Sequence, residues 1–368
     1  MINKMRVTEE FMKLVSIDSP SFKERQMADV LKQYLIQLGF EVTEDDAYKH
    51  YDGNSGNIYG FLKGDIEGDP ILFSAHMDTV EPSTGKKAVK HQDGTITSDG
   101  NTVLGADDLA GVAAILEAVR TIKEKGLSHR SIEVLFTIAE EVYIRGSEVF
   151  DYNRIKAKEA YVLDLSGPVG TAALKAPTLI SFTAEFIGKA SHAGFAPEKG
   201  IHAISVAAEA ITAIKQGRID EETTVNVGTI EGGLARNIVP ERCILKGEVR
   251  SLNHEKTLAE IGKIEHIFKE TAKVRGAKLE FETSFGCIAY EINQEHEVVK
   301  RFEKVCRELG YETDYIATFG GSDNNNFVRN GIMGIVIACG MNAVHSTKEY
   351  THIDELEKCS NITLKLMT

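Results

Sequence analysis

The chain has 368 residues, 42% of them hydrophobic and 26% charged, which is typical of a globular enzyme and long enough to favour two domains. Its formal net charge is −13 and no basic run offsets this charge, so nucleic acid is excluded as an expected partner. The sequence has no signal-peptide core and no long apolar span, and its five cysteines are scattered, so we expect a cytoplasmic protein with no membrane partner.

The first elements predicted in chain order are two helices and a strand. Thr8 is suited to cap a helix over the turns that follow it. Ser21 with Glu24 three residues later resembles a capping box, and apolar residues then recur at helical spacing until Gly39, which suits a helix end. Residues 57–62 next predict a strand.

A second strand, predicted over residues 71–75, runs directly into His76-Met77-Asp78. Residues two apart in an extended segment point the same way, so His76 and Asp78 can share one face. A carboxylate behind a metal-bound histidine fixes its tautomer and orientation. Taken alone, the pattern is better explained by a histidine at a strand end with an ordinary carboxylate neighbour.

Three further apolar strands are predicted to lead into ligand-type residues. Residues 131–139 run into Glu140-Glu141, residues 160–163 run into Asp164, and residues 332–339 are followed by His345. The alternation of strands with helices predicts a doubly wound α/β catalytic domain with a mixed sheet, in which ligands bind beyond the carboxyl ends of the strands. Four such strand ends at one edge therefore predict a functional site.

A clear helix between these strands begins near Asp107 and Asp108 and ends at Gly126. Carboxylates at a helix start suit the helix dipole, so capping is the simpler interpretation of both. One carboxylate is enough to cap a helix, which leaves the other free to act as a ligand.

The order of elements changes between residues 175 and 286. Strands and helices there follow the order β-α-β-β-α-β of the split ferredoxin-like unit. We therefore expect an α+β domain at residues 175–286, inserted into a catalytic domain made of residues 1–174 and 287–368.

The candidate ligands are two imidazoles and three carboxylates, which exceed a single tetrahedral site. They fit two metal ions, each with a histidine and a carboxylate, with Asp107 as the bridge. Two Zn(II) ions carry four positive charges, which three carboxylates and one hydroxide cancel, and a bridging water or hydroxide is the expected nucleophile. The predicted ligands are His76, Asp107, Glu141, Asp164 and His345.

Glu140 lies beside a ligand and is not needed as one, so it is the natural general base, taking a proton from water and returning it to the leaving amine. With these residues in place, the sequence resembles the two-zinc metallopeptidase family that includes peptidase T, glutamate carboxypeptidase and aminoacylase. The resemblance covers the whole chain and is carried by Ser74–Val80, Gly105–Asp108, Ala139–Glu141, Leu163–Asp164, Gly188–Gly194 and His345.

Within this family, Thr102–Val112 looks most like peptidase T. That resemblance implies a zinc aminopeptidase, with cobalt or manganese as substitutes, that hydrolyses the N-terminal residue from short peptides, above all tripeptides. It also implies the same five metal ligands, with Asp78 behind His76 and Glu140 as the base. Leu109 stands where a lysine is common and Tyr143 where a glycine is common, and both departures bear on the substrate rather than on hydrolysis.

The inserted domain resembles the family's lid and dimerisation domain, which implies a homodimer. In that dimer His192 would donate a hydrogen bond to the oxyanion in the partner's site. Asn237, Arg250 and Ser322 are predicted to bind the substrate, since a substrate carboxylate suits a bidentate arginine. The simpler interpretations of the four residues are a surface histidine, a turn residue, a surface ion pair and a helix cap.

Two other functions are compatible with the same residues. An N-acyl-amino-acid amidohydrolase or a carboxypeptidase would use the same metal site, because the residues of the specificity pocket are not fixed by the motifs. A catalytically silent binding protein on this fold is disfavoured, because Glu140 and every predicted ligand are present.

Overall fold

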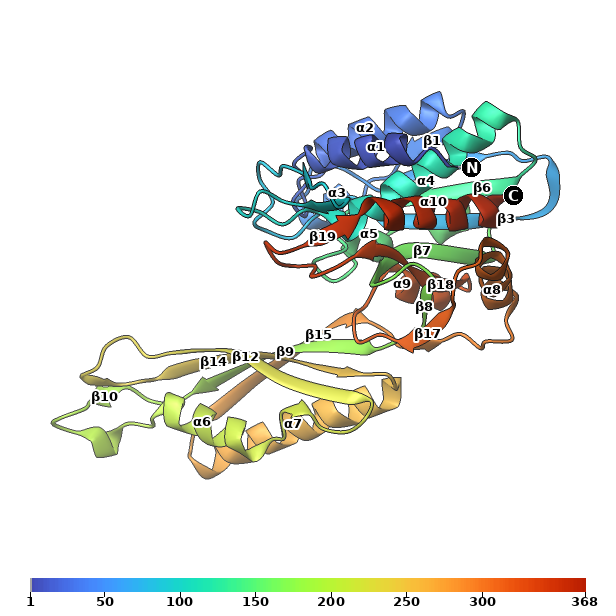
Figure 1. Cartoon of the computed structure of the whole chain (residues 1–368). Helices are drawn as coiled ribbons and strands as arrows, with labels where there is room; N and C mark the ends of the chain where they lie inside the picture. Colours follow the sequence, from blue (N-terminus) through green and yellow to red (C-terminus); the bar gives the residue numbers. More distant parts are fainter. Residues whose placement is uncertain (1) are drawn as a thin grey trace. The chain divides into compact units, whose positions relative to one another are not determined.

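The computed structural model describes residues 2–368, which form two compact units (Figure 1). Unit 1 contains the chain up to residue 175 together with residues 291–317 and 322–368. Unit 2 contains residues 176–290 and 318–321, where the sequence places an inserted domain at 175–286. No helix within residues 2–368 is long and apolar enough to cross a membrane.

Unit 1 is built on a nine-stranded mixed sheet of order β1-β2-β6-β3-β7-β18-β8-β16, with β17 paired to β8. The four central strands β6, β3, β7 and β18 are parallel, whereas β2 and β8 run antiparallel to their central neighbours. The predicted mixed α/β sheet is confirmed. The strands are β1 (Glu41–Glu44), β2 (Ile58–Leu62), β3 (Ile66–His76), β6 (Arg130–Thr137), β7 (Glu159–Ser166), β8 (Thr171–Ala176), β16 (Tyr290–Glu291), β17 (Asp314–Ala317) and β18 (Met333–Met341).

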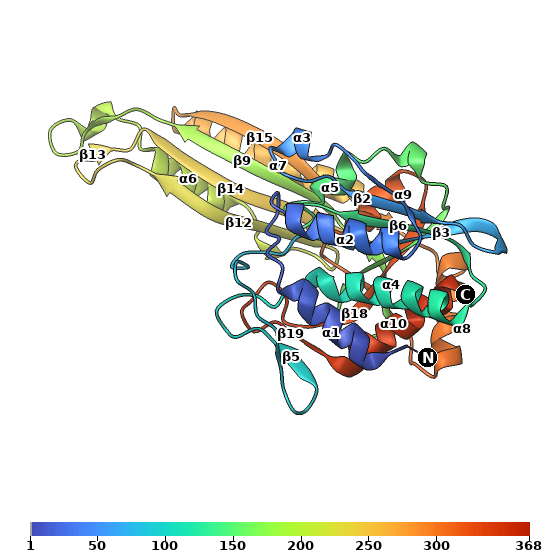
Figure 2. The same ribbon diagram turned by 90° about the horizontal axis from the view of Figure 1, so that it is seen from above.

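Helices cover both faces of this sheet. Leu72, Leu135, Val162 and Val336 are buried on one face and pack in one core cluster with Phe327 of α9. On the opposite face lie α1, α4 and α10 (Figure 2). The helices of unit 1 are α1 (Lys4–Val15), α2 (Arg25–Gln37), α3 (Tyr48–Tyr51), α4 (Ala106–Lys125), α5 (Arg145–Glu148), α8 (Glu297–Leu309), α9 (Asp323–Arg329) and α10 (Ile353–Met367), with a small sheet of β4 (Val89–Lys90), β5 (Thr95–Thr97) and β19 (Tyr350–His352).

Two predicted helix caps are wrong. Helix α1 begins at Lys4 with Asn3 as its cap, so Thr8 lies inside the helix. Helix α2 begins at Arg25 and has no side-chain cap, because Ser21 and Glu24 bond to distant parts of the chain instead. Helix α4 ends as predicted, at Gly126 in the left-handed conformation.

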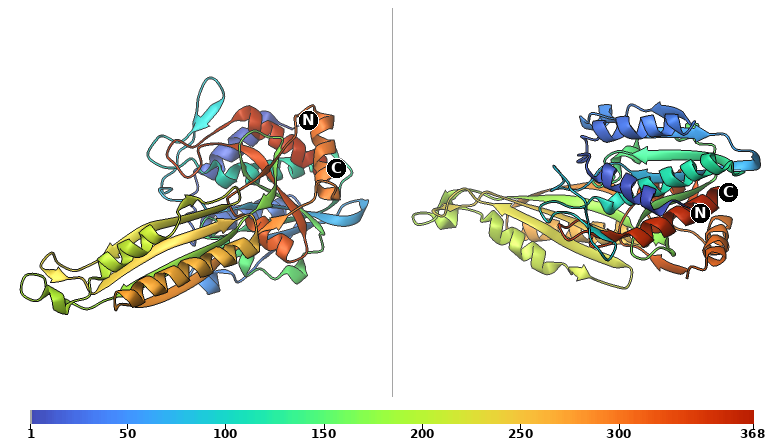
Figure 3. Two further views of the ribbon diagram at one scale, coloured as in Figure 1. Left: turned by 90° about the horizontal axis from the view of Figure 1, so that it is seen from below. Right: turned by 45° about the horizontal axis from the view of Figure 1, so that its top comes forward.

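Unit 2 has the predicted β-α-β-β-α-β order in an antiparallel sheet of order β11-β12-β14-β9-β15. Helices α6 and α7 lie side by side along one face (Figure 3), and Phe182, Phe186 and Phe268 are fully buried in the core between helices and sheet. The elements are β9 (Thr178–Ile187), β10 (Ser191–His192), α6 (Ala203–Ala213), β11 (Gly217–Arg218), β12 (Thr223–Gly232), β13 (Ile238–Val239), β14 (Arg242–Ser251), α7 (His254–Val274) and β15 (Lys278–Cys287).

Candidate active site

The predicted ligands of unit 1 gather at one edge of the sheet, where the parallel strands β6, β3, β7 and β18 have their carboxyl ends. His76 is the last residue of β3, and Glu140 follows the end of β6 by three residues. Asp164 lies within β7 rather than just after it, and His345 lies in the loop after β18 with a φ of 59°. The sequence thus predicted the edge correctly but misjudged where β7 ends.

A buried cluster forms around His76, which is only 1% exposed. Its Nε2 lies 3.0 Å from Oδ1 of Asp107, 3.8 Å from Oδ1 of Asp164 and 4.0 Å from Oε2 of Glu140. The Nδ1 atom lies 2.9 Å from the backbone oxygen of Asp78. A carbonyl can only accept, so Nδ1 carries a proton, and Nε2 is the nitrogen that would bind a metal ion.

A second cluster forms around His345. Its Nε2 lies 2.9 Å from Oε2 of Glu141 and 3.3 Å from Oδ2 of Asp107. Asp107 therefore offers one carboxylate oxygen to His76 and the other to His345. This is the arrangement that a carboxylate bridging two metal ions requires.

The donor set fits metal ions. The atoms of His76, Asp107 and Glu141 lie within 4.8 Å of one another, and so do those of His76, Glu140 and Asp164. Imidazole nitrogen and carboxylate oxygen are ligands that Zn(II) takes readily. Oε1 of Glu141 is buried and has no hydrogen-bond partner in the structure, which costs free energy unless a cation contacts it.

Burial raises the pKa of Glu140 and of Asp164 well above the usual range, and it also raises the pKa of Glu141. Hydrogen bonds to Asp107 and Glu141 raise the pKa of His345 to about 10. Without metal, His345 therefore retains its proton at neutral pH. A metal ion competes with that proton, so binding releases it.

The carboxylate of Asp78 holds the backbone of the adjacent acidic pair. Its Oδ1 accepts from the N–H of Glu140 at 3.0 Å, and its Oδ2 accepts from the N–H of Glu141 at 3.2 Å and from Oγ of Ser21 at 2.7 Å. Its Oδ1 also lies 3.4 Å from Nδ1 of His76. Asp78 thus lies beside His76 as expected. Two of its hydrogen bonds, however, fix the backbone of Glu140, the proposed base, and of Glu141, a predicted ligand.

Glu24 extends this support and was not predicted. Its Oε1 accepts from the N–H of Ala139 at 3.0 Å and from the N–H of Phe22 at 2.7 Å. Burial and the charge of Asp78 raise the pKa of Glu24 to about 8. The Ser21-x-x-Glu24 spacing was the only local signal, and it indicated a helix cap.

The start of α4 also differs from the capping interpretation of its two aspartates. The helix is capped by Gly105, and neither Asp107 nor Asp108 has helical backbone angles; a cis peptide bond joins them. Oδ2 of Asp108 accepts from the N–H of His76 at 3.1 Å. Glu349, another unpredicted residue, accepts from the N–H groups of Gly105 and Asp107 at 2.7 and 2.9 Å.

Ser322 is buried at the start of α9, and its N–H donates to Oδ1 of Asn325 at 3.0 Å. This arrangement agrees with its simpler interpretation as a helix cap. Substrate binding by Ser322 stays a prediction.

Unit 2 brings His192 and Asn237 together, because the N–H of Ala193 donates to the backbone oxygen of Asn237 at 3.0 Å. Nδ1 of His192 accepts from the N–H groups of Gly194 and Phe195 at 3.1 and 3.2 Å. The imidazole proton therefore lies on Nε2, which is free to donate.

Arg250 makes the ion pair that its simpler interpretation expected. Its Nε and Nη2 donate to the carboxylate of Glu248 at 2.8 and 3.2 Å, and its Nη1 donates to the backbone oxygen of Phe319 at 2.9 Å. A substrate carboxylate would have to displace Glu248 to bind the edge of this arginine formed by Nε and Nη2.

Residues 72–368 match Peptidase family M20/M25/M40. The chain belongs to this family. It is 38% identical over 367 residues to the uncharacterized protein YqjE of Bacillus subtilis, with 100% of this chain and 99% of that protein covered.

Two solved structures resemble the whole chain. A tripeptidase from Staphylococcus aureus is 36% identical with a TM-score of 0.96, and aminopeptidase PepT from Bacillus cereus is 38% identical with a TM-score of 0.92. Each comparison covers 100% of this chain and 98% of the other. The predicted resemblance to peptidase T and the predicted enzyme class, a hydrolase that acts as a peptidase, are confirmed.

Proposed function

We propose that this chain is a two-zinc aminopeptidase that removes the N-terminal residue from short peptides, with tripeptides as the main substrates. The observation that carries the proposal is the carboxylate of Asp107, shared between His76 and His345 beside the buried Glu140. The names of the two similar structures, a tripeptidase and an aminopeptidase, support the length of the peptide and the end at which it is cut.

His76 and Asp164 would hold one metal ion, His345 and Glu141 the other, and Asp107 would hold both. When bound, the pair supplies Lewis-acid chemistry, polarising the scissile carbonyl and activating water. Asp78 keeps the backbone of the acidic pair fixed during the reaction through two N–H hydrogen bonds.

Glu140 takes the proton of the attacking water and gives it to the leaving amine. Its carboxylate is 4.0 Å from Nε2 of His76, and the hydrogen bonds of the structure leave both of its oxygens free for this task. Burial raises its pKa, which suits a group that must hold a proton between the two steps. Cations bound beside Glu140 would lower that pKa again, because positive charge favours the carboxylate.

The protein acts as a homodimer in this proposal, with Nε2 of His192 donating to the oxyanion in the partner's site. Phe195 and Leu234 of unit 2 are 87% and 95% exposed, and a partner subunit is a natural cover for such residues. Mixing His192→Ala and Glu140→Gln subunits tests the trans contact. One site of each mixed dimer collects both defects and the other is intact, so about half of the wild-type activity per mixed dimer returns. If the two variants exchange subunits and no activity returns, the trans contact is refuted.

The function itself is tested with metal-loaded protein and a substrate panel. Elemental analysis should give two metal ions per chain, and tripeptides should release their N-terminal residue faster than dipeptides or tetrapeptides. Release of the C-terminal residue would indicate a carboxypeptidase. Hydrolysis of N-acetyl amino acids with no peptide cleavage would indicate an amidohydrolase, and either result overturns the proposal.

A further inference from the structure

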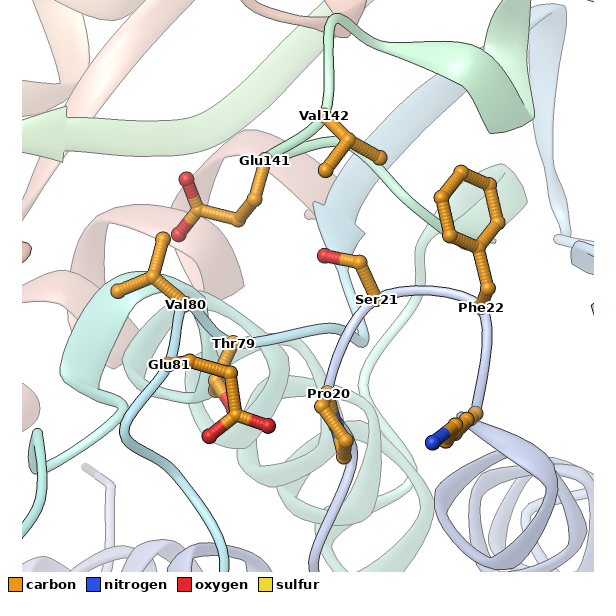
Figure 4. A pocket seen from close by; sticks show the side chains of 9 residues that line it. Pro20, Ser21, Phe22, Thr79, Val80, Glu81, Glu141 and Val142 are labelled. Carbon is orange, nitrogen blue, oxygen red and sulfur yellow. The ribbon is translucent and has the colours of Figure 1, made fainter. Parts of the chain in front are cut away.

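A pocket of about 360 Å³ opens beside the candidate metal site in unit 1 (Figure 4). The metal ligand Glu141 forms part of its wall, so the pocket is continuous with the candidate active site. The other lining residues are Pro20, Ser21, Phe22, Lys23, Thr79, Val80, Glu81 and Val142.

The chemistry of the lining favours an uncharged, apolar guest. The side chains of Phe22, Val80 and Val142 surround the space in Figure 4, and all three are only partly buried, so they have apolar surface to offer a ligand. Lys23 and Glu81 are exposed and carry opposite charges, and the third charged lining residue, Glu141, would be paired with a metal ion, so neither sign of charge is selected. The volume is at the small end of ligand pockets, which suits one side chain rather than a whole peptide.

The pocket is preformed by the same hydrogen bonds that position the catalytic residues. The N–H of Thr79 donates to the backbone oxygen of Ser19 at 3.0 Å, and Oγ of Ser21 donates to Oδ2 of Asp78. The segment that forms one wall is therefore fixed to the segment that follows the metal ligand His76. A guest in the pocket is held in register with the reacting carbonyl.

The position of Glu140 decides which side chain of the substrate enters. Glu140 points toward His76 and Asp164, whereas its neighbour Glu141 lines the pocket. Because the general base must deliver its proton to the leaving amine, that amine lies on the Glu140 side. The acyl part of the substrate then extends past Glu141 toward the pocket, and in an aminopeptidase the acyl part is the N-terminal residue.

We infer that this pocket binds the side chain of the substrate's N-terminal residue and selects apolar side chains such as leucine, with Val142 as a specificity-determining residue. The inference rests on the proposed function, since the direction of the peptide follows from the role of Glu140. It goes further by naming the class of peptide: short peptides with an apolar first residue.

The test compares kcat/KM for Leu-Gly-Gly, Gly-Gly-Gly and Gly-Leu-Gly. In wild-type protein, Leu-Gly-Gly should be preferred over the other two. Val142→Phe fills the pocket and should lower the ratio of Leu-Gly-Gly to Gly-Gly-Gly by about 10- to 200-fold, the range that pocket contacts with a few methylene groups supply. Val142→Ala enlarges the pocket and should shift the preference toward Phe-Gly-Gly.

A matched control is Val89→Phe, because Val89 is 38% exposed in β4 and does not line the pocket. It makes the same substitution and should leave the ratio as in the wild type. Equilibrium binding supplies a readout without turnover: metal-loaded wild-type protein should bind free L-leucine more tightly than glycine, and Val142→Phe should abolish that difference. Metal content is measured for every variant.

The outcomes separate the two proposals. If Val142→Phe changes kcat/KM of Leu-Gly-Gly and Gly-Gly-Gly by the same factor, the pocket does not bind the first side chain. If the variant changes the ratio for Gly-Leu-Gly instead, the pocket binds the side chain on the leaving side, and the inference is wrong while the peptidase function stands. If the wild type with two metal ions cleaves no peptide, the proposed function fails and the inference fails with it.

Discussion

Replacing Asp78 by asparagine should slow the reaction without removing the metal ions. The aspartate accepts two backbone N–H groups, one on each oxygen, and an asparagine can accept only one of them. If the amide nitrogen takes the place of Oδ2, the hydroxyl of Ser21 can turn and accept from it, but the N–H of Glu141 cannot. In either orientation one hydrogen bond to a charged acceptor is lost, about 1.5–3 kcal/mol.

That loss acts on the segment that carries the general base, so we expect it in kcat. The energy corresponds to a decrease of about 10- to 150-fold. A shift of about 1 Å in a catalytic group has an effect of similar size, on the order of 100-fold. The assay is steady-state hydrolysis of Leu-Gly-Gly by Asp78→Asn protein, with metal content measured in the same samples.

Glu24→Gln is the matched control, because it makes the same acid-to-amide change in a neighbouring buried group. Both backbone N–H groups that Glu24 accepts go to Oε1, and Oε2 has no partner in the structure. A glutamine keeps both bonds, and it resembles the protonated glutamate that the raised pKa of about 8 favours. Its kcat should stay within about threefold of wild type. Near-normal kcat in Asp78→Asn, or equal losses in both variants, would refute the positioning role of Asp78.

Three further predictions concern other groups. Glu140→Gln should keep both metal ions but lose about 10²- to 10⁴-fold in kcat, whereas Glu141→Gln should lower the metal content; retained turnover in the first excludes Glu140 as the shuttle. Arg250→Ala should raise KM for free peptides more than for C-terminally amidated ones. Glu248→Gln loosens the ion pair with Arg250 and should lower KM for free peptides. Equal effects of these variants on both peptide forms would exclude recognition of the carboxylate by Arg250. Burial lowers the pKa of Lys86 from 10.5 to about 8, so between those pH values the unfolded chain binds the extra proton and this group's contribution to stability rises with pH. The free energy of unfolding of wild type relative to Lys86→Met should therefore increase by about 3 kcal/mol from pH 8 to 10.5, and a difference that stays constant would show that Lys86 is charged in the fold.

The sequence was informative wherever function coincides with a local pattern. A run such as Ile71–Ala75 is apolar because β3 is buried on both faces, and a histidine directly after it must emerge at the sheet edge. Parallel pairing of β3 with β6 and β7 then brings Glu140 and Asp164 to that edge. The β-α-β-β-α-β order of unit 2 followed from element lengths and spacing in the same way.

The sequence did not reveal the residues that support the site, because their hydrogen-bond partners lie far away in the sequence. Glu24 bonds to Ala139, and Glu349 bonds to the backbone of Gly105 and Asp107. Local rules assigned caps to Ser21, Glu24 and the aspartates that open α4, because capping is the commonest use of such residues. Tertiary hydrogen bonds override those rules for Ser21, Glu24, Asp107 and Asp108, all of which lie at the candidate active site.

The acidic residues at the site fall into two sets, which differ in whether their carboxylates accept hydrogen bonds from backbone N–H groups. Asp78, Asp108, Glu24 and Glu349 each accept at least one backbone N–H, so the fold already supplies them with hydrogen-bond donors. Within residues 2–368, no backbone N–H hydrogen bond reaches the carboxylates of the second set, which face the histidines or one another. Burial without such donors raises the pKa values of Glu140, Glu141 and Asp164, and cations or protons must supply what the backbone does not. Carboxylates of the same chemistry therefore have two roles in this fold. The first set supports the backbone of the site, and the second set, which is Asp107, Glu140, Glu141 and Asp164, is available to bind metal ions and to transfer protons.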